Sequence, residues 1–261
     1  MHLEKIKIIF FDIDGTLIDM NRKQISEKTL ETLIRLKEKN IILCLSTGRS
    51  PQTLPHFDGW EADAFLTFNG SYCYNRQQII YKNPIPVEEV KKIVQNAALI
   101  NRPVSVASTD TLAANGTDAD LAQYFAFAKL EVNVSDDFQD IIEKKEIYQI
   151  MSGGREREYP DLLKDVRHAK IAAWWDRAVD IIPADSGKGT GVNKILDYYH
   201  LNRAQALAFG DGNNDIEMFQ AVGTGIAMEN ASDSLKAVAS DVCGHVTADG
   251  VYHYCVSHGL L

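Results

Sequence analysis

Two carboxylates one residue apart, Asp12 and Asp14, directly follow the apolar segment 6–10. That segment is typical of a buried strand, and in an open parallel sheet ligands bind at the carboxyl ends of the strands. Neighbouring acids repel each other, and a divalent cation would remove the repulsion. Gly15 lets the chain turn sharply and brings backbone amides toward the same point. The alternative interpretation is an ordinary surface turn, for which Asp-Gly is a common signal.

Two further segments have features that suit a phosphate. Thr47 and Gly48 follow the apolar segment 41–45 and offer a hydroxyl with helix N-terminal amides, although plain N-capping is the alternative. Lys188 opens a predicted helix, where the helix dipole disfavours a cation. A nearby anion would explain this lysine, and a solvated side chain is the alternative.

A glycine-rich turn, 210–215, follows another apolar segment and carries Asp211, Asn214 and Asp215. An ordinary turn would seldom be so rich in acid, whereas carboxylates are the ligands that Mg²⁺ prefers. Taken together, a hydroxyl and a lysine could hold phosphoryl oxygens while carboxylates hold Mg²⁺. One carboxylate would then be left to attack phosphorus.

The composition excludes several classes of protein. The chain has 261 residues, a net charge of −9 and a pI near 5.3, which argue against general binding to nucleic acid or to an anionic membrane. We find no apolar run long enough to cross a bilayer and no signal-peptide pattern at the N-terminus. The four cysteines lack the spacing of a metal site, and Cys44 lies in an apolar strand pattern. We expect a cytoplasmic protein.

The first eighty residues alternate strand and helix patterns, an order typical of βαβ units around a parallel sheet. An amphipathic helix is expected at about 26–39, with Ser26 as its N-cap. Strands are expected at 6–11, 41–45 and 64–68, with a hairpin at 72–74 and 79–81. After residue 185 we expect helices at 188–199, 215–219, 232–239 and 250–258, and strands at 205–209 and 224–227.

The middle of the chain differs in character. Pro84 and Pro86 indicate one linker, and Pro183 indicates a second. Between them we expect helices at 86–99, 118–129 and 156–163 and strands at 103–107, 146–151, 170–175 and 179–182, whereas the pattern at 136–145 is ambiguous. We therefore predict a core domain of residues 1–83 and 185–261, with a second domain, 84–184, inserted into it.

The motifs together resemble the haloacid dehalogenase (HAD) superfamily of aspartyl-phosphate phosphohydrolases. More narrowly, the chain resembles the Cof-type sugar-phosphate phosphatases, which carry a large cap inserted after the second motif. The motifs concerned are Asp12 to Thr16, Thr47 to Arg49, Lys188, and Gly210 to Asp215. The resemblance covers nearly the whole chain and implies an α/β fold, with a Rossmann-like parallel-sheet core domain and an inserted α+β cap domain. One local departure is Gly187, which separates Ser186 from Lys188.

The resemblance implies Mg²⁺-dependent hydrolysis of a small phosphomonoester, in the first place a hexose phosphate. Asp12 would be the nucleophile, and Asp14 would be the general acid and then the general base. The cation would be bound by Asp12, the backbone carbonyl of Asp14 and Asp211.

The phosphate-binding residues implied by the resemblance are Thr47, Gly48, Lys188 and, more weakly, Asn214. Asp215 would orient Lys188 or a metal-bound water. The inserted cap would close over the site and confer specificity. Its candidate contacts with the leaving group are Trp174, Trp175, Asp176 and Arg177, although the two tryptophans are as well explained as core or hinge residues.

Asn69 and Gly70 could face the substrate or simply form a turn. A phosphosugar mutase of the same superfamily would share Asp12 and Asp14, so the motifs do not separate it from a phosphatase. A non-catalytic sensor of phosphorylated ligands is disfavoured because both acids are intact. Nucleotide, flavin and pyridoxal phosphates remain alternative substrates, and the oligomeric state does not follow from the sequence.

Overall fold

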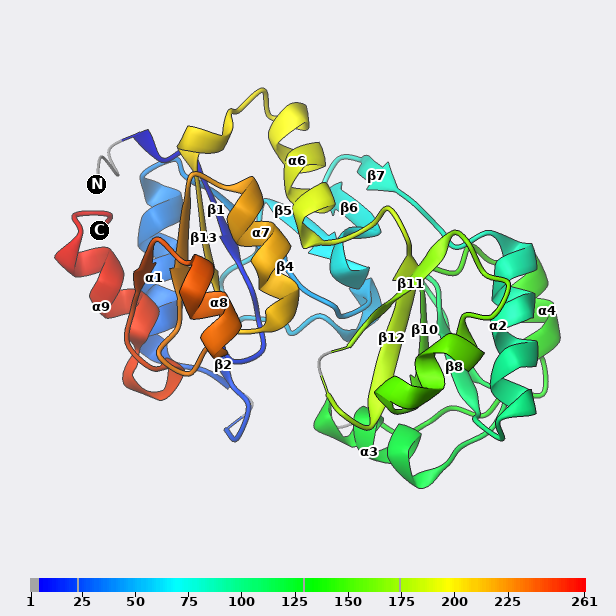
Figure 1. Ribbon diagram of the computed structural model, residues 1–261. Coiled ribbons are helices and arrows are strands. Elements are labelled where there is room, and N and C mark those ends of the chain that lie inside the picture. Colours follow the sequence, from blue (N-terminus) through cyan, green and yellow to red (C-terminus); the bar gives the residue numbers. More distant parts are fainter. Residues whose placement is uncertain (1–4, 23, 129, 174) are drawn as a thin grey trace. The chain divides into compact units, whose positions relative to one another are not determined.

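The described chain divides into two compact units, each with its own sheet (Figure 1). The computed structural model describes residues 5–22, 24–128, 130–173 and 175–261. The first unit comprises the described residues up to Gly48, Pro55–Lys82 and Gly187–Leu261, and the second comprises Arg49–Leu54 and Asn83–Ser186. Among the described residues, no helix is both long and apolar enough to cross a bilayer.

The first unit contains a mainly parallel sheet of eight strands in the order β15-β14-β13-β1-β4-β5-β6-β7. These are β15 (Asp241–Val242), β14 (Thr224–Ala227), β13 (Ala206–Gly210), β1 (Ile8–Phe11), β4 (Ile42–Ser46), β5 (Ala64–Thr67), β6 (Tyr72–Asn75) and β7 (Ile79–Lys82). Pairing is parallel from β15 to β5 and antiparallel from β5 to β6 and from β6 to β7. Every residue of β1 is buried, as expected for a strand covered on both faces.

Helices cover both faces of this sheet (Figure 1). One face carries α1 (Glu27–Glu38) and α9 (Gly250–Ser257), and the other carries α6 (Lys188–Tyr198), α7 (Ile216–Ala221) and α8 (Asp233–Val238). Ser26 caps α1 by accepting a hydrogen bond from the Thr29 amide at 3.0 Å. A small ribbon of β2 (Ile18–Asp19) and β3 (Gln24–Ile25) leads from the turn after β1 toward α1. The predicted α/β fold with a parallel core is confirmed.

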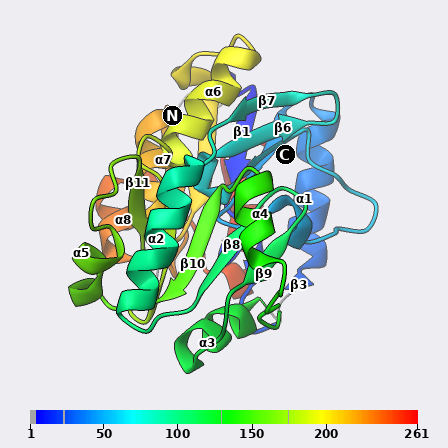
Figure 2. The same cartoon turned by 90° about the vertical axis from the view of Figure 1, so that its right-hand side faces the viewer.

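The second unit contains a five-stranded antiparallel sheet in the order β11-β12-β10-β8-β9. Its strands are β11 (Ala169–Ala172), β12 (Ala178–Pro183), β10 (Gln149–Gly153), β8 (Val104–Ala107) and β9 (Leu112–Ala114). Its helices are α2 (Val87–Leu99), α3 (Ala119–Phe127), α4 (Phe138–Lys144) and α5 (Tyr159–Leu162). Figure 2 shows α2 and α4 side by side over β10 and β8. Alternate strand residues such as Val106, Ile150 and Ile181 form the core beneath these helices.

Several predicted elements of the second unit were wrong in detail. The strand expected at 146–151 is β10, which begins and ends later in the chain. Its position is set by its neighbours, since Ile150 pairs with both Val106 and Ile181. The ambiguous segment 136–145 contains α4. The helix expected at 156–163 is a 3₁₀ turn, Glu156–Glu158, followed by the short α5, in which Pro160 occupies the first turn. The strand β9 was not predicted, since three residues carry little periodicity.

Candidate active site

Three of the predicted site residues follow three neighbouring strands of the first unit. The strand β1 lies between β13 and β4, and Phe11 is in register with both Phe209 and Leu45. Asp12, Asp211 and Thr47 therefore emerge at the same carboxyl edge of the sheet, where parallel α/β sheets bind ligands. The sheet register thus gathers side chains that are far apart in the sequence.

Lys188 is fully buried at the first position of α6. Its Nζ donates a hydrogen bond to Asp12 Oδ1 at 2.7 Å and to Asp215 Oδ1 at 2.5 Å. A cation at a helix N-terminus opposes the helix dipole, and these two carboxylates compensate for that. Lys188 therefore restrains the orientation of the Asp12 side chain.

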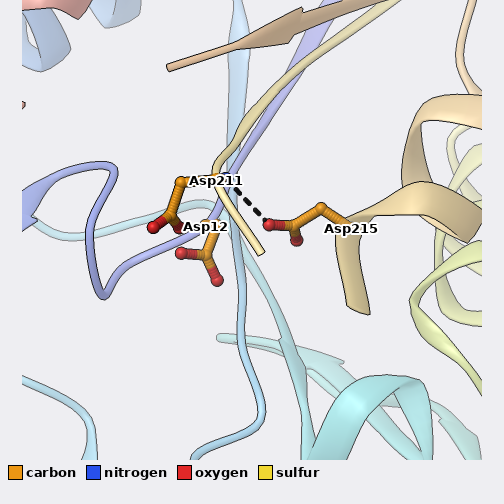
Figure 3. A group of neighbouring side chains, drawn as sticks. All are labelled: Asp12, Asp211 and Asp215. Atoms are coloured by element: carbon orange, nitrogen blue, oxygen red, sulfur yellow. Dashed lines mark hydrogen bonds between the residues drawn. The ribbon is translucent and has the colours of Figure 1, made fainter. Parts of the chain in front are cut away.

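Three carboxylates form a compact group beside this lysine (Figure 3). Asp12, Asp211 and Asp215 each offer one oxygen, and these oxygens all lie within 4.8 Å of one another. Asp215 is completely buried, and its Oδ2 accepts hydrogen bonds from the backbone amides of Asp211 and Gly212, both at 3.0 Å. Asp215 thus contacts Lys188 directly and also contributes an oxygen to the carboxylate group.

The charges of this group are not balanced. Burial raises the pKa of Asp12 well above its usual range. The charge of Lys188 opposes this rise, and the charge of Asp215 adds to it. Burial and the Asp215 charge likewise raise the pKa of Asp211 to about 7. Burial alone would lower the pKa of Lys188, but Asp12 and Asp215 outweigh it and raise that pKa. When all three carboxylates are ionised, one ammonium leaves two negative charges, and this all-oxygen donor set fits a divalent cation such as Mg²⁺.

Asp14 lies half-buried in the turn that follows β1. The turn is closed by a hydrogen bond from the Gly15 amide to the Ile18 carbonyl at 2.9 Å. Gly15 has φ +91°, and a Cβ at this position would overlap the Asp211 carboxylate, so glycine is required on both grounds. Thr16 Oγ1 donates to Asp211 Oδ1 at 3.4 Å. The turn is therefore packed directly against Asp211.

Asn69 joins two of the predicted phosphate-binding loops. It is buried in a left-handed conformation with φ +51°. Its backbone amide donates to the Thr47 carbonyl at 3.0 Å, and its Oδ1 accepts a hydrogen bond from Asn214 Nδ2 at 3.1 Å. A Cβ on Gly48 would lie 3.0 Å from Asn69 Nδ2, so Gly48 lets the amide pack against the loop. The segment after β5 thus connects the loops after β4 and β13.

The glycine before Lys188 has a steric explanation. A Cβ on Gly187 would overlap the Glu217 carboxylate, and a Cβ on Gly70 would overlap the Gly187 carbonyl. The backbone that leads into α6 is therefore enclosed between α7 and the Asn69–Gly70 turn. This close approach accounts for the local departure of the sequence at Gly187.

One contact of the site was missed by the sequence analysis. Asn230 lies in the loop after β14, and its Nδ2 donates to the Gly15 carbonyl at 2.8 Å. It also approaches Asp211 Oδ2 at 3.3 Å. The signal that could have revealed it is the one used for Asp12, namely a polar residue just after an apolar strand pattern.

The candidates in the second unit lie among residues of that unit. Trp175 packs edge-on against Phe127 with a centroid separation of 5.0 Å, and the Arg177 guanidinium lies 4.4 Å from its ring centroid. Asp176 is exposed, and Trp174 lies outside the described residues. Arg49, which follows Gly48, donates to the Thr53 carbonyl at 2.9 Å.

Comparisons with known proteins bear on the whole chain. A model of the haloacid dehalogenase-like hydrolase family matches residues 9–255. The chain is 30% identical to the Bacillus subtilis protein YkrA, over 98% of each chain. It is also 30% identical to the 5-amino-6-(5-phospho-D-ribitylamino)uracil phosphatase YitU of Bacillus subtilis, over 95% of each. The solved structure of the HAD subclass IIB sugar phosphatase BT4131 superposes with a TM-score of 0.86 at 25% identity, covering 98% of this chain and all of that one.

Proposed function

The chain belongs to the haloacid dehalogenase-like hydrolases and is a phosphatase, and we propose that it is a Mg²⁺-dependent enzyme that hydrolyses small sugar phosphates through an aspartyl-phosphate intermediate. The observation that carries the proposal is the ammonium of Lys188 between Asp12 and Asp215, with Asp211 beside them. The Asp12 carboxylate is hydrogen-bonded by an ammonium group and lies beside further carboxylates that could bind a cation. This arrangement suits attack by Asp12 on phosphorus next to a metal ion.

Asp12 acts as the nucleophile in this mechanism. One oxygen of its carboxylate forms a bond to phosphorus while the bond from phosphorus to the ester oxygen breaks. The hydrogen bond from Lys188 to Oδ1 holds the carboxylate in one orientation, so little reorganisation precedes the attack. The product of this step is an aspartyl-phosphate and an alkoxide that requires a proton.

Asp14 supplies that proton from its carboxyl group, so the leaving group departs as an alcohol. The resulting Asp14 carboxylate then removes a proton from a water molecule that attacks the phosphoryl group. The bond from phosphorus to Asp12 breaks, inorganic phosphate leaves, and both side chains return to their starting protonation states. Asp14 lies in the turn closed by Gly15 and Ile18, two residues after the proposed nucleophile.

The remaining residues would bind the phosphoryl group and the cation. Thr47 and the Gly48 amide, together with Lys188 and Asn214, would hold the equatorial phosphoryl oxygens. Asp12, the Asp14 carbonyl and Asp211 would hold Mg²⁺. When bound, the cation would keep the Asp12 and Asp211 carboxylates ionised and neutralise charge on the phosphoryl group. Asp215 also accepts a hydrogen bond from Lys188 and so restrains it.

Sugar phosphates are the favoured substrate class because the chain resembles the sugar phosphatase BT4131 along its whole length. A specific observation favours a second class. YitU, whose name specifies a phosphorylated ribityl chain on a uracil, is equally similar to this chain as YkrA in percentage identity. Both classes present a phosphate on a primary or secondary alcohol of a polyol, so the same attack applies to either.

A substrate panel with defined metal content tests this function. We expect release of inorganic phosphate from hexose phosphates or from a ribityl phosphate in the presence of Mg²⁺. Chelation should abolish the release, and excess Mg²⁺ should restore it. Undiminished hydrolysis in excess chelator would refute the metal requirement, and an isomerised sugar phosphate in place of free phosphate would show a mutase.

A further inference from the structure

Asn230 connects three parts of the first unit that the sequence keeps far apart. Its Nδ2 donates to the Gly15 carbonyl at 2.8 Å and to Asp211 Oδ2 at 3.3 Å. Its Oδ1 accepts a hydrogen bond from the Val246 amide at 3.1 Å. An amide side chain has two N–H bonds and one carbonyl, and here each has a partner. Its orientation is fixed as well, since a flipped amide would point its oxygen at the Gly15 carbonyl.

We infer that Asn230 is a positioning residue that aims the Asp211 carboxylate at the cation. The inference rests on the proposed function, because it assigns Asp211 to a Mg²⁺ site. Among the residues that the structure describes, the side chains that donate to Asp211 are Thr16 and Asn230, one to each oxygen. Removal of Asn230 would leave the long hydrogen bond from Thr16, at 3.4 Å, as the side-chain restraint on this carboxylate.

Asn230 contacts the turn after β1 as well as Asp211. Asp211 Oδ2 lies against Gly15 so closely that a Cβ there would overlap it. Asn230 binds the carbonyl of that same Gly15, so one amide contacts both the turn after β1 and the carboxylate after β13. Ligand oxygens from two separate loops must be held at a fixed spacing if both are to bind one small cation.

The backbone around Asn230 is itself tied to β13. The Met228 amide donates to the Gly210 carbonyl, and the Ser232 amide donates to the Asp211 carbonyl, both at 3.0 Å. The loop after β14 therefore runs alongside the end of β13, and Asn230 extends from a supported backbone. A hydrogen bond from such a backbone restrains its partner at little further cost in entropy.

The experiment replaces Asn230 with leucine, which has a similar volume and no hydrogen-bonding groups. Asn202→Leu is the matched control, because Asn202 caps a 3₁₀ turn of the same unit through the Ala204 amide at 3.0 Å. Calorimetric titration of the substrate-free proteins with Mg²⁺ gives the affinity, and thermal unfolding with and without Mg²⁺ gives an independent readout. Asn230→Ala, a smaller change, is measured in parallel in case the leucine variant does not fold.

We expect Asn230→Leu and Asn230→Ala to bind Mg²⁺ about 10-fold or more weakly than the wild type. The rise in melting temperature caused by Mg²⁺ should shrink in parallel. Asn202→Leu should bind Mg²⁺ like the wild type. Folded Asn230 variants with wild-type Mg²⁺ affinity would overturn this inference alone, whereas a wild-type protein that binds no Mg²⁺ would overturn the proposed function with it.

Discussion

The two units each contain a cluster of acids around a basic side chain, but the charges balance in only one of them. In the second unit, Arg102 contacts Glu158 at 3.0 Å and both Asp118 and Asp120 at 3.1 Å, and Arg155 contacts Asp120 at 2.7 Å. Arg177 also lies 3.9 Å from Asp120, so three arginines face three acids. Hydrogen bonds from Arg155 and Arg102 hold the pKa of Asp120 below its usual range, and those from Arg102 do the same for Glu158. Each acid of this cluster therefore has an arginine partner.

In the acidic cluster of the first unit, the charges do not balance. There, burial and the charge of Asp215 raise the pKa of Asp12 and of Asp211, and the charge of Lys188 does not offset the rise. Neighbouring positive charges favour the ionised form of an acid, and such pairs stabilise a fold. Buried acids that lack enough positive charge nearby are candidates for binding a positively charged ligand, which would favour their ionised form. In this protein the pKa shifts of the two clusters run in opposite directions.

The largest expected effect is the loss of turnover in Asp12→Asn. The amide cannot form the aspartyl-phosphate, so kcat for phosphate release should fall by roughly 10³-fold or more. The matched variant in the second unit, Asp120→Asn, should keep kcat within a few-fold, because it alters only the balanced cluster. Steady hydrolysis by purified Asp12→Asn at a rate near that of the wild type would contradict the assignment of the nucleophile.

The next effect concerns stability. Lys188→Met leaves Asp12 and Asp215 buried without their shared cation, which should lower the free energy of unfolding by about 3–5 kcal/mol in the absence of Mg²⁺. Urea unfolding at pH 8 in chelator measures this loss. A Lys188→Met protein as stable as the wild type would show that the lysine does not compensate these acids.

A smaller loss is expected from Arg102→Met in the second unit. The guanidinium and its partners are partly accessible, so solvent can replace some of the lost hydrogen bonds. We expect the free energy of unfolding to fall by about 1–3 kcal/mol. The same urea experiment measures it, and a loss that exceeds that of Lys188→Met would reverse the comparison between the two clusters.

The smallest effect is the pH dependence of the stability that Arg102 provides. In the folded protein the pKa values of Asp120 and Glu158 lie below their ordinary values of 3.8 and 4.5. The stability that Arg102 provides is therefore fully present above those ordinary values and is lost as the pH falls through the folded ones. The difference in unfolding free energy between wild type and Arg102→Met should shrink from about pH 6 to about pH 3. An equal or larger difference at the lower pH would contradict this account.

Much of the first unit could be predicted because its signals are local. Ser26 caps α1 where expected, and the apolar segments before Asp12, Thr47 and Asp211 form neighbouring strands of one sheet. The second unit was predicted less well. The register of β10 depends on Val106 and Ile181, and the hydrophobic pattern of the strand itself does not specify its partners.

The sequence by itself determined which residue types stand at the ends of apolar strands, because side-chain chemistry and strand periodicity are properties of short segments. Only the tertiary structure decided that Lys188 lies between Asp12 and Asp215, and that Asn230 contacts both Gly15 and Asp211. Those contacts join positions up to 215 residues apart. They arise from the order β14-β13-β1-β4 in the sheet, and the pairing of parallel strands through crossover connections leaves no local pattern in the chain.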